Sequence, residues 1–129
     1  MKLIIADDSD MMRNRIRNLL RQNPNVEIAG EAKNGIEALQ LVLEHQPDLL
    51  ILDFKMPGLN GLEVMKKIKS EGNKAKICIL TNYPYPQYRE KCFDEGADYF
   101  FNKADDFEKI NLAIEDVLRD TGEVSLTII

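Results

Sequence analysis

The chain has 129 residues, of which 44% are hydrophobic and 30% charged, as is typical of a single globular domain with a sizeable core. The formal net charge of −5 argues against nonspecific binding to nucleic acid, which requires a basic footprint. No apolar stretch approaches the ~20 residues of a membrane span, and the N-terminus runs straight into a strand pattern rather than an export signal. We therefore expect a cytoplasmic protein with no direct nucleic-acid or membrane partner. Cys78 and Cys92 lie in apolar patterns without metal-ligand spacing, as thiols in a reducing compartment do.

Strand and helix patterns alternate along the whole chain. Three of the strands are near-continuous apolar runs, the pattern of strands that are covered on both faces in a parallel sheet. The expected strands are Lys2–Ala6, Val26–Ala29, Leu49–Leu52, Lys76–Leu80 and Tyr99–Phe101. Val26–Ala29 alternates in polarity, which favours a position nearer the sheet edge. Apolar residues at helical spacing predict helices around Met11–Leu20, Ile36–Leu43, Leu62–Ile68, Pro86 to Gly96 and Phe107–Leu118.

Polar residues mark several of the expected helix starts. Ser9 and Asp10 can cap the first helix, and Asn60 followed by Glu63 resembles a capping box for the third. Asp105 and Glu108 together are expected to open the last helix. Right-handed crossovers would place the helices on both faces of the sheet. The sequence thus predicts an α/β, doubly wound, five-stranded parallel sheet in one domain, residues 1–121, followed by a tail, residues 122–129, which we expect to be a linker, an edge strand or disordered.

Acidic residues follow two of the apolar strand patterns. Asp7 and Asp8 follow the first strand, and Asp53 follows the third. Because the carboxyl ends of parallel strands meet at one edge of the sheet, these side chains should share a crevice. Two carboxylates about 5 Å apart repel by roughly 3 kcal/mol at an effective dielectric constant of ~20. A hard divalent cation would relieve this repulsion, and oxygen ligands favour Mg²⁺.

Two further residues at strand ends extend this predicted site. Thr81 follows the fourth strand, and Lys103 lies just beyond the fifth. An ammonium group and a metal ion beside Asp53 would create a positive field suited to a transferring phosphoryl group. The Asp53 carboxylate would then be the attacking group, and Thr81 could donate a hydrogen bond to a phosphoryl oxygen.

These residues give the chain a close resemblance to the CheY-like receiver domains of bacterial response regulators in two-component signalling, over residues 2 to about 120. The resemblance implies the flavodoxin-like strand order 2-1-3-4-5. By motif, Asp7 and Asp8 match the acidic pair that holds Mg²⁺. Asp53, within Leu52-Asp53-Phe54-Lys55-Met56-Pro57-Gly58, matches the phosphoacceptor and a metal ligand, and the backbone carbonyl of Lys55 would complete the protein ligands.

The resemblance extends to the residues that read the phosphoryl group. Thr81 matches the hydroxyl that senses it, Phe100 the switch aromatic, and Lys103 the active-site lysine. The chain departs from the family's pattern after Lys103, because Ala104 stands where the family often has a proline. We therefore expect a trans peptide bond there. Lys55 and Tyr83 lie two residues past Asp53 and Thr81, and their bulk could shield an acyl phosphate from water.

The resemblance also implies partners and a switching surface. A sensor histidine kinase or a histidine phosphotransfer protein would donate the phosphoryl group, and an unidentified downstream protein would bind the activated domain. Such a domain is a signal transducer rather than an enzyme, with at most slow self-dephosphorylation. The output surface would be the fourth helix, fifth strand and fifth helix, with the candidate residues Tyr85, Tyr88, Arg89, Tyr99 and Lys109. The first helix carries Arg13, Arg15, Arg17 and Arg21, which we interpret as a solvated face that could meet a kinase.

Three other functions compete with this interpretation. Asp8-Ser9-Asp10 resembles the nucleophile motif of haloacid-dehalogenase-type phosphatases, with Asp8 as nucleophile and Thr81 and Lys103 as later motifs. However, Met11-Met12 replaces the usual continuation, no cap domain fits, and Asp53 would have no role. A flavodoxin-type mononucleotide binder would need a hydroxyl-rich phosphate loop where this chain has acids. A receiver-like module that never carries phosphate is disfavoured by the complete set of site residues.

Overall fold

The computed structural model describes residues 1–122, which form five parallel strands and the helices that connect them. The strands are β1 (Lys2–Ala6), β2 (Glu27–Ala32), β3 (Leu49–Asp53), β4 (Lys76–Thr81) and β5 (Tyr99–Asn102). The α-helices are α1 (Asp10–Leu20), α2 (Gly35–His45), α3 (Gly61–Ser70), α4 (Pro86–Asp94) and α5 (Ile110–Thr121), and a short 3₁₀ helix, η1, covers Phe107–Lys109. Of the tail expected at residues 122–129, all but Gly122 lies outside the described residues.

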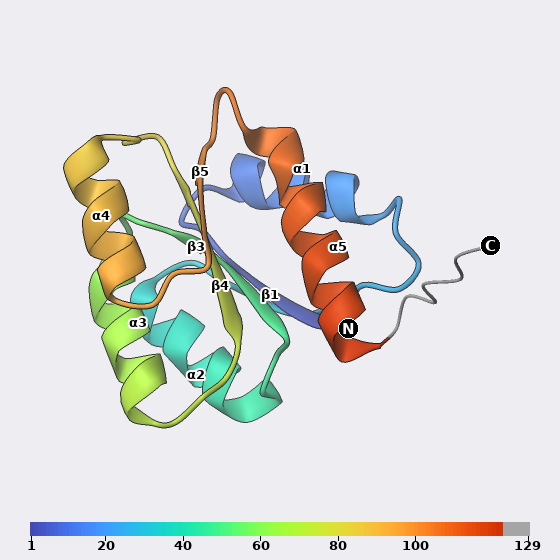
Figure 1. Ribbon diagram of the computed structural model, residues 1–129, viewed down its shortest axis with the longest axis horizontal. Coiled ribbons are helices and arrows are strands. Elements are labelled where there is room, and N and C mark those ends of the chain that lie inside the picture. The colour runs from blue at the N-terminus through green and yellow to red at the C-terminus, as the bar shows by residue number, and fades with distance from the viewer. Residues whose placement is uncertain (123–129) are drawn as a thin grey trace.

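The strands pair in the order β2-β1-β3-β4-β5, which confirms the predicted doubly wound sheet. Helices α1 and α5 cover one face of the sheet, and α2, α3 and α4 cover the other (Figure 1). Successive side chains of a strand point to opposite faces. In β1, therefore, Ile4 packs into the core beneath α2 and α3, whereas Ile5 packs into the core beneath α1 and α5. Within residues 1–122, no helix has the length and hydrophobicity needed to cross a bilayer.

Three local expectations were wrong. The second strand begins at Glu27 and continues through Ala32, because its backbone pairs with β1 beyond the alternating segment. The last helix begins at Ile110, since the chain first forms η1 and the Asp106 carboxylate accepts a hydrogen bond from the Asn102 amide. Met11, counted among the apolar residues of the first helix, is 82% exposed.

The caps of the first and third helices agree with their sequence signals. Ser9 caps α1 by accepting a hydrogen bond from the Met12 amide at 3.2 Å, whereas Asp10 lies in the first turn. Asn60 and Glu63 form the complete capping box of α3. These caps fix where each helix leaves the carboxyl edge of the sheet, and thereby fix the loops that follow β1 and β3.

Candidate functional site

The three predicted acids meet at the carboxyl edge of the sheet. Asp7 directly follows β1, and Asp53 is the last residue of β3, the neighbouring strand. Asp7, Asp8 and Asp53 each place a carboxylate oxygen within 4.8 Å of the others. Asp7 and Asp53 are buried, and Asp8 is exposed at the mouth of the cluster. Segments separated by more than 40 residues thus form one acidic site.

Lys103 lies between two of these acids. Its Nζ is 2.7 Å from Asp7 Oδ2 and 3.2 Å from Asp53 Oδ2, and the residue is only 5% exposed. Burial alone would lower the pKa of Lys103, but the hydrogen bonds and charges of Asp7 and Asp53 outweigh it and raise that pKa. The lysine is therefore a protonated, buried cation bound to the predicted phosphoacceptor.

The Asp53 carboxyl group has an unusually high proton affinity. Burial raises its pKa to about 6, and the negative charge of Asp7 adds to this rise. The Lys103 ammonium and the hydrogen bond from the Lys55 amide act in the opposite direction without cancelling it. One ammonium group is thus insufficient to compensate the crowded carboxylates, and additional positive charge would stabilise the site.

Short loop contacts hold the carboxylates in place. The Ser9 amide donates to Asp7 Oδ1 at 2.9 Å, and the Lys55 amide approaches Asp53 Oδ1 at 3.3 Å. Gly61, the first residue of α3, packs so closely that a Cβ there would lie 3.1–3.2 Å from the backbone of Asp53 and Phe54. Because Gly61 has no side chain, the loop after Asp53 can fold back against the end of β3.

The carboxylates suit a small hard cation. Mg²⁺ binds oxygen at about 2.0–2.1 Å, so two ligands on opposite sides of the ion lie roughly 4.2 Å apart. The observed limit of 4.8 Å for the oxygens of Asp7, Asp8 and Asp53 is close to this span. Small side-chain rotations would bring these oxygens around one ion, with waters at the remaining positions.

Thr81 and Phe100 lie on the neighbouring strands β4 and β5, where Thr81 pairs with Asn102 and Phe100 with Ile79. Thr81 is fully buried at the end of β4, and its Oγ1 accepts a hydrogen bond from the Tyr83 amide at 2.9 Å. The hydroxyl proton therefore stays available for donation. Phe100 in β5 is 5% exposed and packs in the core beneath α3 and α4. Its carbonyl lies 3.4 Å from Nη1 of Arg89 on α4.

A pair of bulky side chains joins two loops at this edge of the sheet. Lys55 Nζ lies 4.2 Å from the centre of the Tyr83 ring, within cation–π range. This contact connects the loop after Asp53 to the loop after Thr81. The bond between Lys103 and Ala104 is trans, as expected, and the Lys103 amide donates to the Thr81 carbonyl at 2.9 Å.

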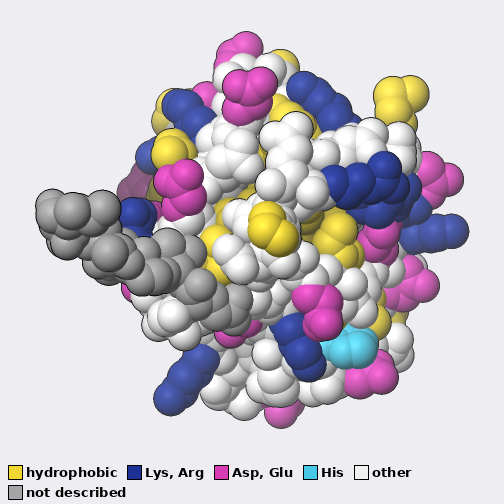
Figure 2. Space-filling model, turned by 90° about the vertical axis from the view of Figure 1, so that its right-hand side faces the viewer, with side chains coloured by type: hydrophobic (Ala, Val, Ile, Leu, Met, Phe, Trp, Pro, Cys, Tyr) yellow, Lys and Arg dark blue, Asp and Glu magenta, His cyan; other side chains and the backbone are white. Residues whose placement is uncertain are grey.

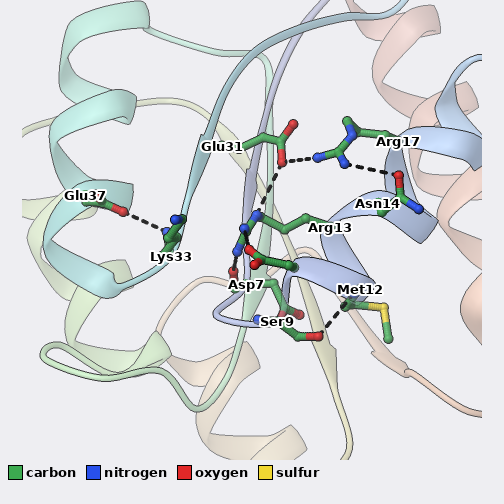
Figure 3. A network of polar contacts seen from close by, with 10 residues as sticks. Asp7, Ser9, Met12, Arg13, Asn14, Arg17, Glu31, Lys33 and Glu37 are labelled. Carbon is green, nitrogen blue, oxygen red and sulfur yellow. Dashed lines mark hydrogen bonds and ion pairs between the residues drawn. The ribbon is translucent and has the colours of Figure 1, made fainter.

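One site contact was missed by the sequence interpretation. Arg13 was grouped with the arginines of a solvated helix face, but it is only 6% exposed and points to the acidic loop (Figure 3). Its Nη1 donates to the Asp7 carbonyl at 2.6 Å. The signal that could have revealed it is helical spacing, since Arg13 lies three residues before Ile16 and therefore on the buried side of α1.

Comparison with known proteins places these features in a family. The family model for the response regulator receiver domain matches residues 3–115. The chemotaxis protein CheY of Halobacterium salinarum is 35% identical over 117 residues, covering 91% of this chain and 96% of CheY. The oxygen regulatory protein NreC of Staphylococcus epidermidis is 35% identical over 127 residues, covering 98% of this chain but 58% of NreC. The chain thus spans little more than half of the length of NreC.

A solved structure agrees with these relatives. A DNA-binding response regulator of the LuxR family from Staphylococcus aureus superposes with a TM-score of 0.83 at 34% identity, covering 90% of this chain and 97% of that one. The segment that matches the family model, residues 3–115, contains Asp7, Asp8, Asp53 and Lys103. This chain therefore belongs to the response regulator receiver domains of two-component signalling systems.

Proposed function

We propose that this receiver domain accepts a phosphoryl group on Asp53 from a phosphorylated histidine of a sensor kinase or a histidine phosphotransfer protein. One observation carries the proposal: Lys103 Nζ lies 3.2 Å from Asp53 Oδ2 inside a cluster of three carboxylates at the carboxyl edge of the sheet. This arrangement leaves a carboxylate nucleophile beside a fixed cation, as phosphoryl transfer requires.

The transfer exchanges one phosphorus bond for another. An Asp53 oxygen attacks the phosphorus, a P–O bond forms, and the P–N bond to the donor histidine breaks with its electron pair going to the imidazole nitrogen. Lys103 neutralises charge on the phosphoryl oxygens, because its Nζ is held at the site by Asp7 and Asp53. The product is an acyl phosphate, whose slow hydrolysis would return Asp53 to its free form, so the domain transduces a signal rather than turning over a substrate.

The side chains of Asp7, Asp8 and Asp53 and the backbone carbonyl of Lys55 would hold Mg²⁺. When bound, the ion supplies positive charge that screens the carboxylates from one another and from the incoming phosphoryl oxygens. The raised pKa of Asp53 supports this assignment, because a nearby cation favours the ionised carboxylate that must act as nucleophile.

Thr81 and Phe100 would convert phosphorylation into a change of shape. A charge-assisted hydrogen bond from the Thr81 hydroxyl contributes about 1.5–3 kcal/mol. Moving a population from 1:99 to 99:1 requires about 5.5 kcal/mol. Thr81 alone thus gives a partial shift, and the Lys103 contact and repacking of Phe100 must supply the rest. Because the Phe100 ring is already buried, its contribution is a change of packing partners rather than a gain in burial.

The surface formed by α4, β5 and α5 would report this change to a downstream protein. Arg89 on α4 connects the switch to that surface, since its guanidinium contacts the Phe100 carbonyl and lies 5.8 Å from the Phe100 ring centre. Tyr85 is 51% exposed nearby, and the Tyr99 hydroxyl donates to Asp116 of α5 at 3.1 Å. Repacking of Phe100 would therefore move groups on all three elements.

The proposed partners are proteins in the cytoplasm. On the face drawn in Figure 2, Asp and Glu side chains lie beside the Lys and Arg side chains. Together with the net charge of −5, this supports a domain without direct contact to nucleic acid. The Staphylococcus aureus structure is described as a DNA-binding response regulator, and that description applies to that protein.

Intact mass measurement tests the proposal. We expect the chain to gain the mass of one phosphoryl group when incubated with a small phosphodonor and Mg²⁺, and Asp53→Ala to gain none. Equal labelling of the variant would overturn the assignment. The phosphatase alternative, in which Asp8 is the nucleophile, finds no support in the geometry, because Lys103 binds Asp7 and Asp53 while Asp8 is exposed.

A further inference from the structure

Arg13 is the arginine of α1 that faces the acidic site. Arg15 and Arg21 are exposed, and Arg17 is half-buried, but only 6% of Arg13 is exposed. A buried guanidinium carries a large desolvation cost unless its donors are satisfied. The acceptors of the Arg13 hydrogen bonds therefore indicate which part of the structure this side chain stabilises.

The Arg13 guanidinium spans three separate elements of the fold (Figure 3). Its Nη1 donates to the backbone carbonyl of Asp7 at the end of β1, at 2.6 Å. Its Nη2 pairs with the carboxylate of Asp10 in the first turn of α1, and its Nε lies 3.3 Å from Glu31 Oε1 on β2. Arg17 binds the same Glu31 oxygen at 2.5 Å and holds that anchor in place.

These contacts bracket Asp8. The Asp7 carbonyl belongs to the peptide bond that leads into Asp8, and Asp10 follows two residues later. Arg13 thus binds the main chain before the exposed acid and the side chain of Asp10 after it, while the Ser9 amide donates to the Asp7 carboxylate within the same turn. Arginine carries its donors on three nitrogens spread over a planar fork, whereas lysine carries its three donors on a single nitrogen.

We propose that Arg13 is a positioning residue for the turn of residues 7–10, which would hold Mg²⁺. It acts through its contacts with the Asp7 carbonyl and Asp10, and its contact with Glu31 fixes its own position. The proposal rests on the proposed function, since it assigns Arg13 to the same Mg²⁺ site. It goes further because it connects the turn of residues 7–10, through Arg13 on α1, to Glu31 on β2. The Arg17–Glu31 ion pair there is half-buried.

Positioning and simple charge predict opposite effects on metal affinity. Arg13 is a cation close to the acids, so removing its charge should strengthen Mg²⁺ binding if charge were its only influence. If Arg13 instead fixes the conformation of the turn of residues 7–10, removing it should weaken Mg²⁺ binding, even though the site becomes more negatively charged. Outer contacts to metal ligands typically account for 10–100-fold in affinity. The sign of the change therefore decides between the two roles.

The experiment compares Arg13→Gln and Arg13→Lys with matched controls at the exposed C-cap residue of the same helix, Arg21→Gln and Arg21→Lys. Isothermal titration with Mg²⁺ alone, without phosphodonor, measures affinity. We expect both Arg13 variants to bind about tenfold more weakly or worse, and both Arg21 variants to remain near the wild-type value. Unchanged or tighter binding by Arg13→Gln, or full affinity in Arg13→Lys, would overturn the proposal.

Amide hydrogen exchange in the metal-free protein separates positioning from general damage. Arg13→Lys should speed exchange at Ser9 and Met12, whose amides are bonded within the turn and cap, while exchange in β3 and β4 stays at the wild-type rate. Unaltered exchange at Ser9, or an increase spread evenly through the sheet, would contradict the proposal. Absence of Mg²⁺ uptake by the wild-type chain would contradict the proposed function instead, and the exchange rates would still decide the role of Arg13.

Discussion

Replacing Asp53 by asparagine should make the metal-free protein more stable at neutral pH. Asp53 is 6% exposed, and burial together with the charge of Asp7 raises its pKa from 3.8 to about 6. A rise of about two units corresponds to roughly 3 kcal/mol. Lys103 keeps its 2.7 Å contact with Asp7 in the variant, so the substitution does not leave that ammonium group without a partner.

The direction of the pH dependence follows from proton linkage. Between pH 3.8 and about 6 the folded protein binds a proton at Asp53 more tightly than the unfolded chain does. The free energy of unfolding contributed by this group is therefore highest at low pH and falls as the pH rises through that window. Asp53→Asn has no proton to lose, so this contribution to the pH dependence disappears.

Urea unfolding in the presence of a chelator measures the effect. We expect the free energy of unfolding of Asp53→Asn, relative to wild type, to increase by about 2–3 kcal/mol between pH 4 and pH 7.5. Asp94→Asn, which alters an exposed acid on α4, serves as the control. A difference between Asp53→Asn and wild type that stays constant over this pH range would refute the idea that Asp53 is held in an unfavourable charged state.

Four other variants test three separate parts of the structure. Thr81→Ala should still be phosphorylated at the wild-type level but show a smaller shift in the NMR spectrum of α4 and β5; loss of phosphorylation would contradict its role as a sensor. Lys55→Ala and Tyr83→Ala should each speed decay of the acyl phosphate, measured by intact mass over time, because each removes one partner of the 4.2 Å contact between the loops that follow Asp53 and Thr81; unchanged decay would end this hypothesis. Leu52→Ala, at a fully buried position in β3, should lower the free energy of unfolding by about 2–5 kcal/mol in urea titrations; a loss below that range would show that the sheet repacks.

The fold was largely predictable because its central strands are buried on both faces. Runs such as Leu49–Leu52 cannot alternate in polarity when both sides are covered, and they stand out from the amphipathic helices. The edge strand β2 was harder to place, since Gly30, Glu31 and Ala32 have low strand propensity and are held by pairing with β1. The start of α5 depended on how Asp106 bonds back to Asn102, which no helical periodicity encodes.

The convergence of the site residues was predictable from topology alone. The carboxyl ends of parallel strands share one edge, and this brought Asp7, Asp53 and Lys103 together as expected. Arg13 was misinterpreted because a guanidinium on a helix is usually solvated, whereas here the Asp7 carbonyl, Asp10 and Glu31 on β2 satisfy its donors. Contacts that depend on the register between α1 and β2 require three-dimensional information.

Mapping the phosphorylated residue would show whether Asp53 is the phosphoacceptor. The chain would be treated with a small phosphodonor and Mg²⁺, reduced with borohydride, which converts an acyl phosphate to an alcohol, and sequenced by tandem mass spectrometry. We expect the reduced residue to lie at position 53 and to be absent when Mg²⁺ is chelated. Reduction at position 8, or labelling that is independent of the metal, would contradict this expectation.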